Sequence, residues 1–383
     1  MTRTTIAGLG SLLTAAVLVG CSDPAGPASL DRANLGTPSF AVAGATPMRL
    51  DQFNGTTNAV GTAILKGFNP TNPHRGDAII ATFFWSGSTN IITSVGDHLT
   101  DGTPVGNTYT LVDYAQAGGL SMATYVATNV QNFPDPNVDA FGQPDQNKVL
   151  VVQANLSSSI TLGGVMLSSY RGVTVSLGAH SSATGAGSSV TTASGGAIPV
   201  NAGGVVYGVT MSNQVTGVEP PPSPFANVNN MSDPGSTLKI DGEYAAQASA
   251  GTVDAQWQWF FNSPSAWLAT VLTLNPVATN LTFRTQPVTT LPLATIPTVR
   301  VAVEDDLGNT MTSFNGTVTI AIGHNGGVVL PGTLSGTKTV PVVNGIATFS
   351  DLSIDQPGNG YTLRVTATGL LGAESAAFNI GAL

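Results

Sequence analysis

Short runs in which apolar and polar residues alternate, separated by clusters of glycine, proline, asparagine and serine, are what most constrain the fold of this chain. A period of two matches the pleat of a half-buried strand, whereas an amphipathic helix needs apolar residues every three or four positions. No window of useful length has the helical spacing. The sequence therefore predicts an all-β protein, with strands at 78–85, 109–113, 121–128, 148–154, 165–170, 205–210, 256–261 and 267–274.

The region 46–276 carries all of these runs, with long polar insertions between them. Their number and spacing favour a jelly-roll-like two-sheet sandwich over a small barrel. The pattern lies in Gly76–Ile80, Asn107–Leu111, Tyr125–Val130, Ser169–Val173 and Ala266–Thr270. It resembles a lectin-like sandwich module of bacterial surface and secreted proteins. This resemblance implies an architecture and brings no active site with it.

A second region, 279–381, follows a short polar junction at 275–279. Val299, Val301 and Val303 alternate with Arg300 and Ala302, so we expect one face of this strand to lie in a core. Because the junction is short and each region has its own alternating strands, we expect the two regions to fold independently.

The family character of the second region lies in four stretches, Val299–Asn309, Gly345–Ile354, Gly360–Leu363 and Ser375–Ile380. They resemble the bacterial Ig-like repeats of adhesins and multi-domain surface proteins. The resemblance implies an Ig-like β-sandwich that acts as a spacer or rigid unit. Tyr361, after a glycine and before an alternating strand, is placed like a tyrosine corner.

The N-terminus carries a secretory signal. Arg3 precedes an apolar stretch from Ile6 to Val19, which is too short to span a bilayer as a helix. Leu18-Val19-Gly20-Cys21 follows, with the one cysteine of the chain. This motif resembles the bacterial lipobox, which implies cleavage before Cys21 and a lipid on its thiol. We therefore expect a signal peptide at 1–20 and a lipidated tether rich in Pro, Gly, Ala and Ser at 21–45.

The charge of the chain limits which partners it can bind, and its cysteine content limits the disulfides it can form. Without Arg3 the balance is 11 Lys and Arg (12 minus 1) against 21 Asp and Glu, a net charge of −10. Nucleic acid and anionic lipid surfaces need a basic footprint, so they are excluded as partners. The membrane is contacted through the lipid, and Ser22 after Cys21 favours the outer membrane, facing the surface or the periplasm. A single cysteine allows no intramolecular disulfide.

An acidic loop is a candidate metal site. Asp135, Asn137 and Asp139 have the 1-3-5 spacing of calcium-binding loops, and Asp145 follows. Ala140 stands where an EF-hand needs glycine, so the likeness is partial. The loop is either a structural Ca²⁺ site or a solvated acidic hairpin, and no cofactor is otherwise required.

Two tryptophans are a candidate ligand face. Trp257 and Trp259 alternate along one strand with Gln256 and Gln258. If they are exposed, their rings can stack on sugars; if they are buried, they fill a core between sheets. The sequence leaves both interpretations open.

Signatures of catalysis are weak. The four histidines lack the spacing of a zinc site, and no Gly-x-Ser-x-Gly elbow is present. We therefore expect no enzyme, but a lipid-anchored surface protein that binds glycan or protein. The alternatives are a polysaccharide lyase or glycoside hydrolase, which needs two carboxylates flanking a cleft, and a purely structural coat subunit. Glu243 is the glutamate that we expect to face such a groove.

The lipobox interpretation predicts that Cys21→Ser leaves the protein unlipidated and largely uncleaved. A hydroxyl cannot replace the thiol as lipid acceptor, and the lipoprotein peptidase acts after lipidation. Metabolic labelling with palmitate measures this directly. Label that persists in the variant would contradict the anchor.

Overall fold

The computed structural model describes residues 48–172, 174–186, 192–214, 220–235, 237–259 and 266–381. The predicted signal peptide, Cys21 and the predicted tether lie outside the described residues. The prediction of an all-β protein is confirmed, because the described elements are strands apart from one short 3-10 turn, Gln146–Lys148. Within the described residues, no helix has the length and apolar character to cross a membrane.

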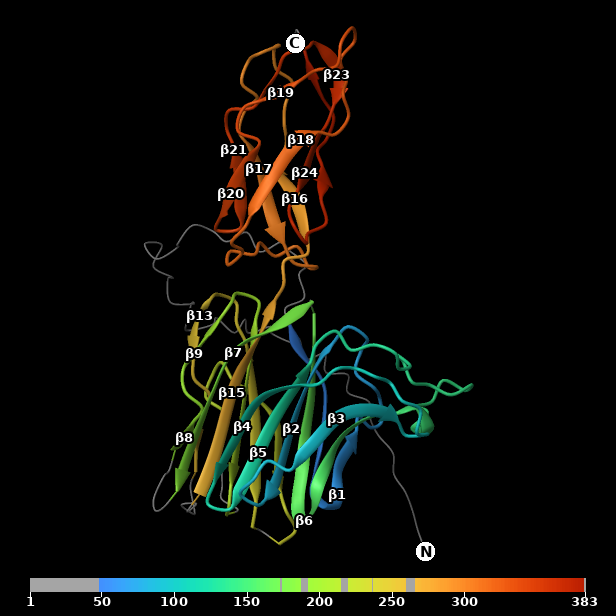
Figure 1. The fold of residues 1–383 in the computed structure, drawn as a ribbon, viewed down its shortest axis with the longest axis vertical. Helices are drawn as coiled ribbons and strands as arrows, with labels where there is room; N and C mark the ends of the chain where they lie inside the picture. Colours follow the sequence, from blue (N-terminus) through green and yellow to red (C-terminus); the bar gives the residue numbers. More distant parts are fainter. Residues whose placement is uncertain are drawn as a thin grey trace, which may run out of the picture. The chain divides into compact units, whose positions relative to one another are not determined.

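The first sheet is built from the strands up to residue 171 (Figure 1). Its order is β1-β6-β2-β5-β4, β3 also pairs with β6, and every pair is antiparallel. The strands are β1 (Arg49–Gly67), β2 (Ala78–Ser86), β3 (Ile92–Leu99), β4 (Thr110–Ala117), β5 (Leu120–Ala127) and β6 (Leu150–Arg171).

The second sheet takes the following strands in the order β11-β12-β10-β15-β7. They are β7 (Val175–Ala186), β10 (Val205–Ser212), β11 (Ala226–Ser232), β12 (Lys239–Ala246) and β15 (Ala266–Pro276). The facing sides of the two sheets share one core, in which Phe84 and Met166 from the first sheet pack with Tyr207 and Leu272 from the second. Each sheet thus buries one face against the other, as in a sandwich.

Both outer faces of the sandwich are covered as well. Loops pack over Phe83, Trp85 and Val152 on the first sheet. Two pairs of short antiparallel strands cover the second sheet: β8 (Thr192–Ser194) with β14 (Gln256–Gln258), and β9 (Ile198–Val200) with β13 (Gly251–Val253). The central strands β2 and β10 are therefore buried along nearly their whole length.

The path of the chain differs from the jelly roll expected from the sequence. A jelly roll is made of two Greek keys, whose connections run between the sheets. Here strands β1 to β6 complete the first sheet before β7 begins the second. The two-sheet sandwich is confirmed, and its connectivity is one sheet after the other.

Strands from 280 onward enclose a core of their own. One set of strands has the order β16-β17-β21-β20-β18-β24-β25, and β19-β22 and β23-β26 form two further pairs. Val299, Val301 and Val303 lie in this core as predicted, and all of its buried members fall between Leu281 and Ile380. The strands are β16 (Asn280–Thr285), β17 (Val299–Glu304), β18 (Thr317–Ile322), β19 (Leu334–Ser335), β20 (Thr339–Val343), β21 (Ile346–Phe349), β22 (Ser353–Ile354), β23 (Gly358–Tyr361), β24 (Leu363–Thr366), β25 (Ala373–Glu374) and β26 (Phe378–Ile380).

The hydrogen bond of a tyrosine corner, predicted for Tyr361, is present. The Tyr361 side chain is fully buried, and its hydroxyl donates to the backbone carbonyl of Gln356 at 3.0 Å. Its ring lies against Phe378 of β26, with ring centroids 6.2 Å apart. The bond ties the segment before β23 to the core and satisfies a polar atom inside it.

We expect Tyr361→Phe to destabilise the region 279–381 by about 1–3 kcal/mol, because the carbonyl of Gln356 loses its donor in a buried place. Urea unfolding of the full chain, followed with probes for each region, measures the change. Tyr125→Phe is the matched control, since within the described residues no hydrogen bond of the Tyr125 hydroxyl is seen; it should change little. Equal shifts of both unfolding transitions in Tyr361→Phe would contradict two separate cores.

Candidate functional site

The ends of three strands of the first sheet place charged residues side by side. Arg49 of β1 lies opposite Arg171 of β6, and Ala78 of β2 lies opposite Tyr170. The start of β1, the end of β6 and the start of β2 therefore meet at one end of the sheet. Asp51, two residues along β1, and the loop just before β2 lie at this end.

The loop before β2 is held by its own backbone. The Asp77 N–H donates to the carbonyl of His74, the Gly76 N–H donates to the carbonyl of Val130, and the Val130 N–H donates to the carbonyl of Asp77. Gly76 has φ +92°, a conformation that side chains other than glycine disfavour. These bonds fix His74 and Asp77 against the end of β5.

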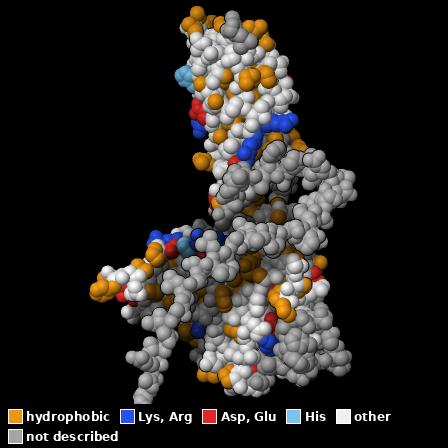
Figure 2. Space-filling model, turned by 180° about the vertical axis from the view of Figure 1, so that it is seen from behind, with side chains coloured by type: hydrophobic (Ala, Val, Ile, Leu, Met, Phe, Trp, Pro, Cys, Tyr) orange, Lys and Arg blue, Asp and Glu red, His pale blue; other side chains and the backbone are white. Residues whose placement is uncertain are grey.

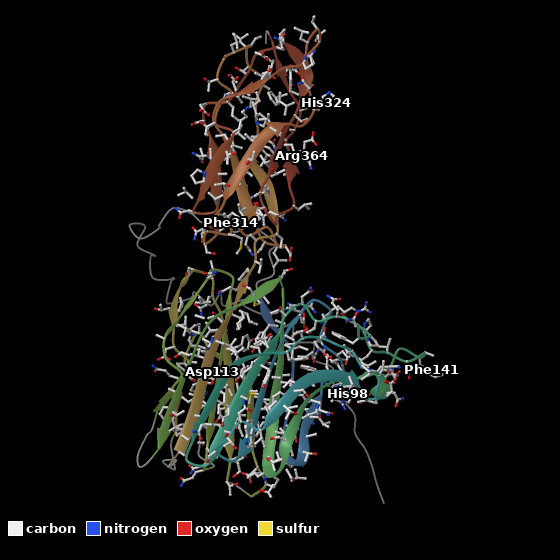
Figure 3. All side chains as sticks on the ribbon, in the orientation of Figure 1. His98, Asp113, Phe141, Phe314, His324 and Arg364 are labelled. Atoms are coloured by element: carbon white, nitrogen blue, oxygen red, sulfur yellow. The ribbon has the colours of Figure 1, made fainter. Side chains whose placement is uncertain are left out.

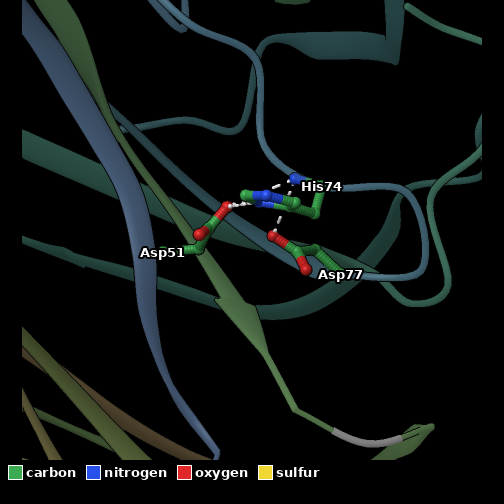
Figure 4. Close-up of side chains that lie close together, drawn as sticks. All are labelled: Asp51, His74 and Asp77. Atoms are coloured by element: carbon green, nitrogen blue, oxygen red, sulfur yellow. Dashed lines mark hydrogen bonds and ion pairs between the residues drawn. The ribbon is translucent and has the colours of Figure 1, made fainter. Parts of the chain in front are cut away.

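Asp51, His74 and Asp77 form a compact network (Figure 4), and Arg171 contacts two of its members, Asp51 and His74. His74 Nδ1 lies 2.8 Å from Asp51 Oδ2, and the His74 backbone N–H is 3.2 Å from both Asp51 Oδ2 and Asp77 Oδ2. One guanidinium nitrogen of Arg171 lies 3.3 Å from Asp51 Oδ1 and 2.8–2.9 Å from the two ring nitrogens of His74. Asp51 thus has contacts on both carboxylate oxygens.

The two carboxyls of this network have opposite protonation preferences. Asp77 is 2% exposed, and burial, together with the charge of Asp51, raises its pKa to about 8. Burial also acts to raise the pKa of Asp51, but hydrogen bonds from His74 and Asp77 outweigh it and the pKa is lowered. At neutral pH the network therefore holds an anionic Asp51 beside a neutral Asp77.

A metal ion fits this network poorly. Ligand atoms of Asp51, His74 and Asp77 lie within 4.8 Å of one another, and no other group of three or more His, Cys, Asp or Glu in the described ranges meets that criterion. The guanidinium of Arg171, however, touches the same histidine ring and the same aspartate. Two cations at this spacing repel each other, so the geometry favours an ion-pair network over a metal centre.

Next to the network is a hollow of about 450 Å³ lined by arginine. Arg49, Arg75 and Arg171 are the three arginines of residues 48–276, and all three line it. Asp306, whose carboxylate accepts hydrogen bonds from the N–H and hydroxyl of Thr174, is also in the lining. Figure 2 shows Lys or Arg, His, and Asp or Glu side chains gathered in one place on this part of the molecule. The arrangement offers guanidinium donors at fixed positions.

The predicted calcium ligands accept hydrogen bonds from backbone N–H groups, two of them from the segment before β2 and two from their own loop. Asp135 accepts from the Arg75 N–H and Asn137 from the Asn72 N–H, while Asp139 accepts from the N–H groups of Phe141 and Gln143. Asp145, the fourth predicted ligand, accepts a hydrogen bond from the N–H of Asn147. The loop projects outward with Phe141 at its end (Figure 3), and its three aspartates are not gathered within metal-ligand distance of one another. The calcium site stays a prediction.

Trp257 and Trp259 lie in a core. Each is 3% exposed, and they pack with Val206 and Val271 on the outer face of the second sheet. Of the two alternatives that the sequence left open, an exposed face or a core, both rings lie in a core. Rings buried to this degree are not available to stack on a sugar.

Glu243 does not face an open groove. It is 1% exposed on β12, beside Asp241, and one of its oxygens accepts from the Gln256 N–H at 3.2 Å. Lys239 lies 3.0 Å from Asp241. Burial raises the pKa of Glu243 to about 8 and that of Asp241 to about 6. All three charged groups are buried, and the contact with Gln256 places β14 against Glu243.

Sequence reasoning missed Asp51, Asp77 and the arginines as a group. They come from positions as far apart as 49 and 171, and no local spacing joins them. The composition held one signal, because residues 48–276 contain only three arginines, but a count does not show that the three lie together in the fold. Comparisons with known proteins add no family: the chain matches no family model and no curated protein.

We expect the free energy of unfolding to fall as the pH rises from about 4 to about 8. Asp77 keeps its proton up to about pH 8 when folded but loses it near 3.8 when unfolded. The folded chain thus binds more protons than the unfolded chain between about pH 4 and pH 8. The contribution of Asp77 to the free energy of unfolding is therefore fully present below about pH 4 and is lost as the pH rises to about 8. Asp77→Asn, which is neutral at every pH, should remove on the order of 2–4 kcal/mol of this fall.

Urea unfolding at a series of pH values measures the slope. Glu243→Gln is the comparison, because Glu243 has a similarly raised pKa elsewhere in the sandwich. Each variant should remove part of the slope and the double variant should remove more. An unchanged slope in Asp77→Asn would show that Asp77 is ionised in the folded protein.

Proposed function

We propose that this chain is a lipid-anchored protein of the bacterial cell envelope whose sandwich binds an external ligand without chemical turnover. The hollow beside the Asp51 network carries the proposal. It gathers every arginine of residues 48–276 in a chain whose formal net charge is −9. A hollow that gathers positively charged side chains on a protein of negative net charge is typical of a ligand-binding site.

The network behind the hollow supports binding over catalysis. Asp51 is in contact with His74 and Arg171, and Asp77 is buried and neutral at pH 7. Groups held in this way keep neighbouring side chains in fixed positions. A ligand that meets preset donors loses less free energy to ordering.

The location rests on the lipobox-like motif at Cys21. Lipidation there, with transfer to the outer membrane, would place the sandwich at the surface or in the periplasm. The Ig-like region 279–381, at the far end of the chain from the anchor, is proposed to act as a rigid unit beside the binding module. Glycan and protein are both candidate ligands. The alternative to ligand binding is a structural role in a surface coat.

A second candidate function is glycoside hydrolysis, and one observation favours it. Asp51 and Asp77 lie within 4.8 Å, one anionic and one protonated, which is the division of roles that a retaining mechanism needs. Their side chains are nearly inaccessible, with Asp77 2% and the Asp51 side chain 8% exposed. A substrate would have to reach both past His74 and Arg171, so binding is the function that the geometry supports better.

A glycan array and a turnover assay separate these functions. We expect the full chain, solubilised in detergent, to bind a subset of glycans and to release no product from them over long incubation. Asp77→Asn should then leave binding within about twofold of wild type, because it keeps the neutral side chain. Product release that Asp77→Asn abolishes would establish the hydrolase instead. Self-assembly with no binding to any glycan or envelope protein would favour the coat.

A further inference from the structure

We propose that the hollow lined by Arg49, Arg75 and Arg171 binds the acidic group of a glycan, a carboxylate of a uronic acid or a sulfate ester. The inference rests on the proposed binding function and names its ligand class. It stands on the geometry of three guanidinium groups around one hollow of about 450 Å³. That volume lies in the range of small-ligand sites.

Two of the three guanidinium groups have free donors. Arg49 is exposed, and within the described residues its side chain has neither a hydrogen-bond acceptor nor an ion-pair partner. Arg75 is exposed too, and its Nε donates to the carbonyl of Phe133 at 3.0 Å, which orients the group; among the described residues its two terminal nitrogens have no acceptor. A planar guanidinium with free N–H groups is suited to bidentate contact with carboxylate or sulfate.

The third guanidinium is positioned by the network. Arg171 contacts Asp51 and the ring of His74 and is one-third exposed. Asp51 and Asp306 each carry a negative charge opposite the three arginines, while burial keeps Asp77 neutral at pH 7. Asp51 lies behind the lining, in contact with Arg171, and Asp306 lies in it, so the three arginines and these two carboxylates together have an excess of one positive charge (three minus two), which one acidic group of a ligand would balance.

The rest of the lining suits a sugar. The exposed amide of Asn129 and the hydroxyl of Thr174 provide donors and acceptors for ring hydroxyls. The formal net charge of −9 repels polymers of high charge density, such as nucleic acid, and anionic bilayers. A glycan with separated acidic groups presents one charge at a time together with hydroxyls.

Matched ligand pairs test the inference with the full chain solubilised in detergent. Polygalacturonate and its fully methyl-esterified form share a backbone and differ in the free carboxylate. Galactose 6-sulfate and galactose differ in a single sulfate ester. We expect the charged member of at least one pair to bind at least tenfold more tightly than its neutral partner, and added NaCl to weaken this binding.

Matched variants assign the binding to the hollow. Arg49→Gln and Arg75→Gln should each weaken binding of the charged glycan about tenfold or more, because each removes charge-assisted hydrogen bonds. Lys66→Gln is the control: it makes the same change of charge at the opposite end of β1 and should stay within about twofold. Unchanged melting temperatures would show that all three variants fold normally, as their exposed or half-exposed positions predict.

The outcomes separate this inference from the proposed function. Binding of neutral glycans that Arg49→Gln and Arg75→Gln leave unchanged would overturn the acidic-group inference while the binding function stands. Equal losses in Lys66→Gln would show general charge attraction and would overturn the assigned site. If poly-glutamate bound as tightly as polygalacturonate through the same arginines, the inference that the ligand is a glycan would be overturned. No binding of any glycan would overturn the proposed glycan-binding function as well.

Discussion

The pairing of β6 with three other strands is the constraint on which the sandwich depends. β6 runs for 22 residues and hydrogen-bonds β1, β2 and β3. Its residues alternate between two cores, with Met166 in the core between the sheets and Val165 and Leu167 in the core on the outer face. A shift of its register by one residue would exchange these two sets of side chains, so both cores fix the same register.

That register also builds the charged site. Since β6 places Arg171 opposite Arg49 and Tyr170 opposite Ala78, the strand ends that carry Asp51 and Asp77 must meet. Close backbone approach supports the same pairing, because a Cβ on Gly164 would come within 1.9 Å of the carbonyl oxygen of Thr56. The site is therefore a consequence of the sheet, and its charges add specificity to a position that apolar packing already determines.

Buried acids give the molecule a common electrostatic character. Asp77 and Glu243 lie in different parts of the sandwich, yet burial raises the pKa of both to about 8. Each lies near a second carboxylate, Asp51 or Asp241, which is in contact with a cation. With few basic residues in the chain, burial leaves Asp77 and Glu243 protonated at neutral pH, while the buried Asp241 and Glu304 are paired with Lys239 and Arg284.

Patterns local in the sequence predicted much of the fold. Alternation located β2, β5, β10 and β15, and the Tyr361 corner was recognised from its neighbours. Strand β1 was missed because its residues are mostly polar and half-buried. The runs at 148–154 and 165–170 proved to be parts of one strand, since Asn155, Ile160 and Gly163 between them still pair with β1.

The sequence by itself determined the all-β class, the two regions and the lipobox-like motif at Cys21, because each depends on residues close together along the chain. Only the tertiary structure decided that Trp257 and Trp259 are buried, that the side-chain oxygens of the acidic loop accept from backbone N–H groups, and that three distant arginines share one hollow. Burial and charge clustering depend on which strands pair, and pairing joins residues more than 100 positions apart, such as Arg49 and Arg171. Periodicity shows that a residue has a buried face, but not what covers it.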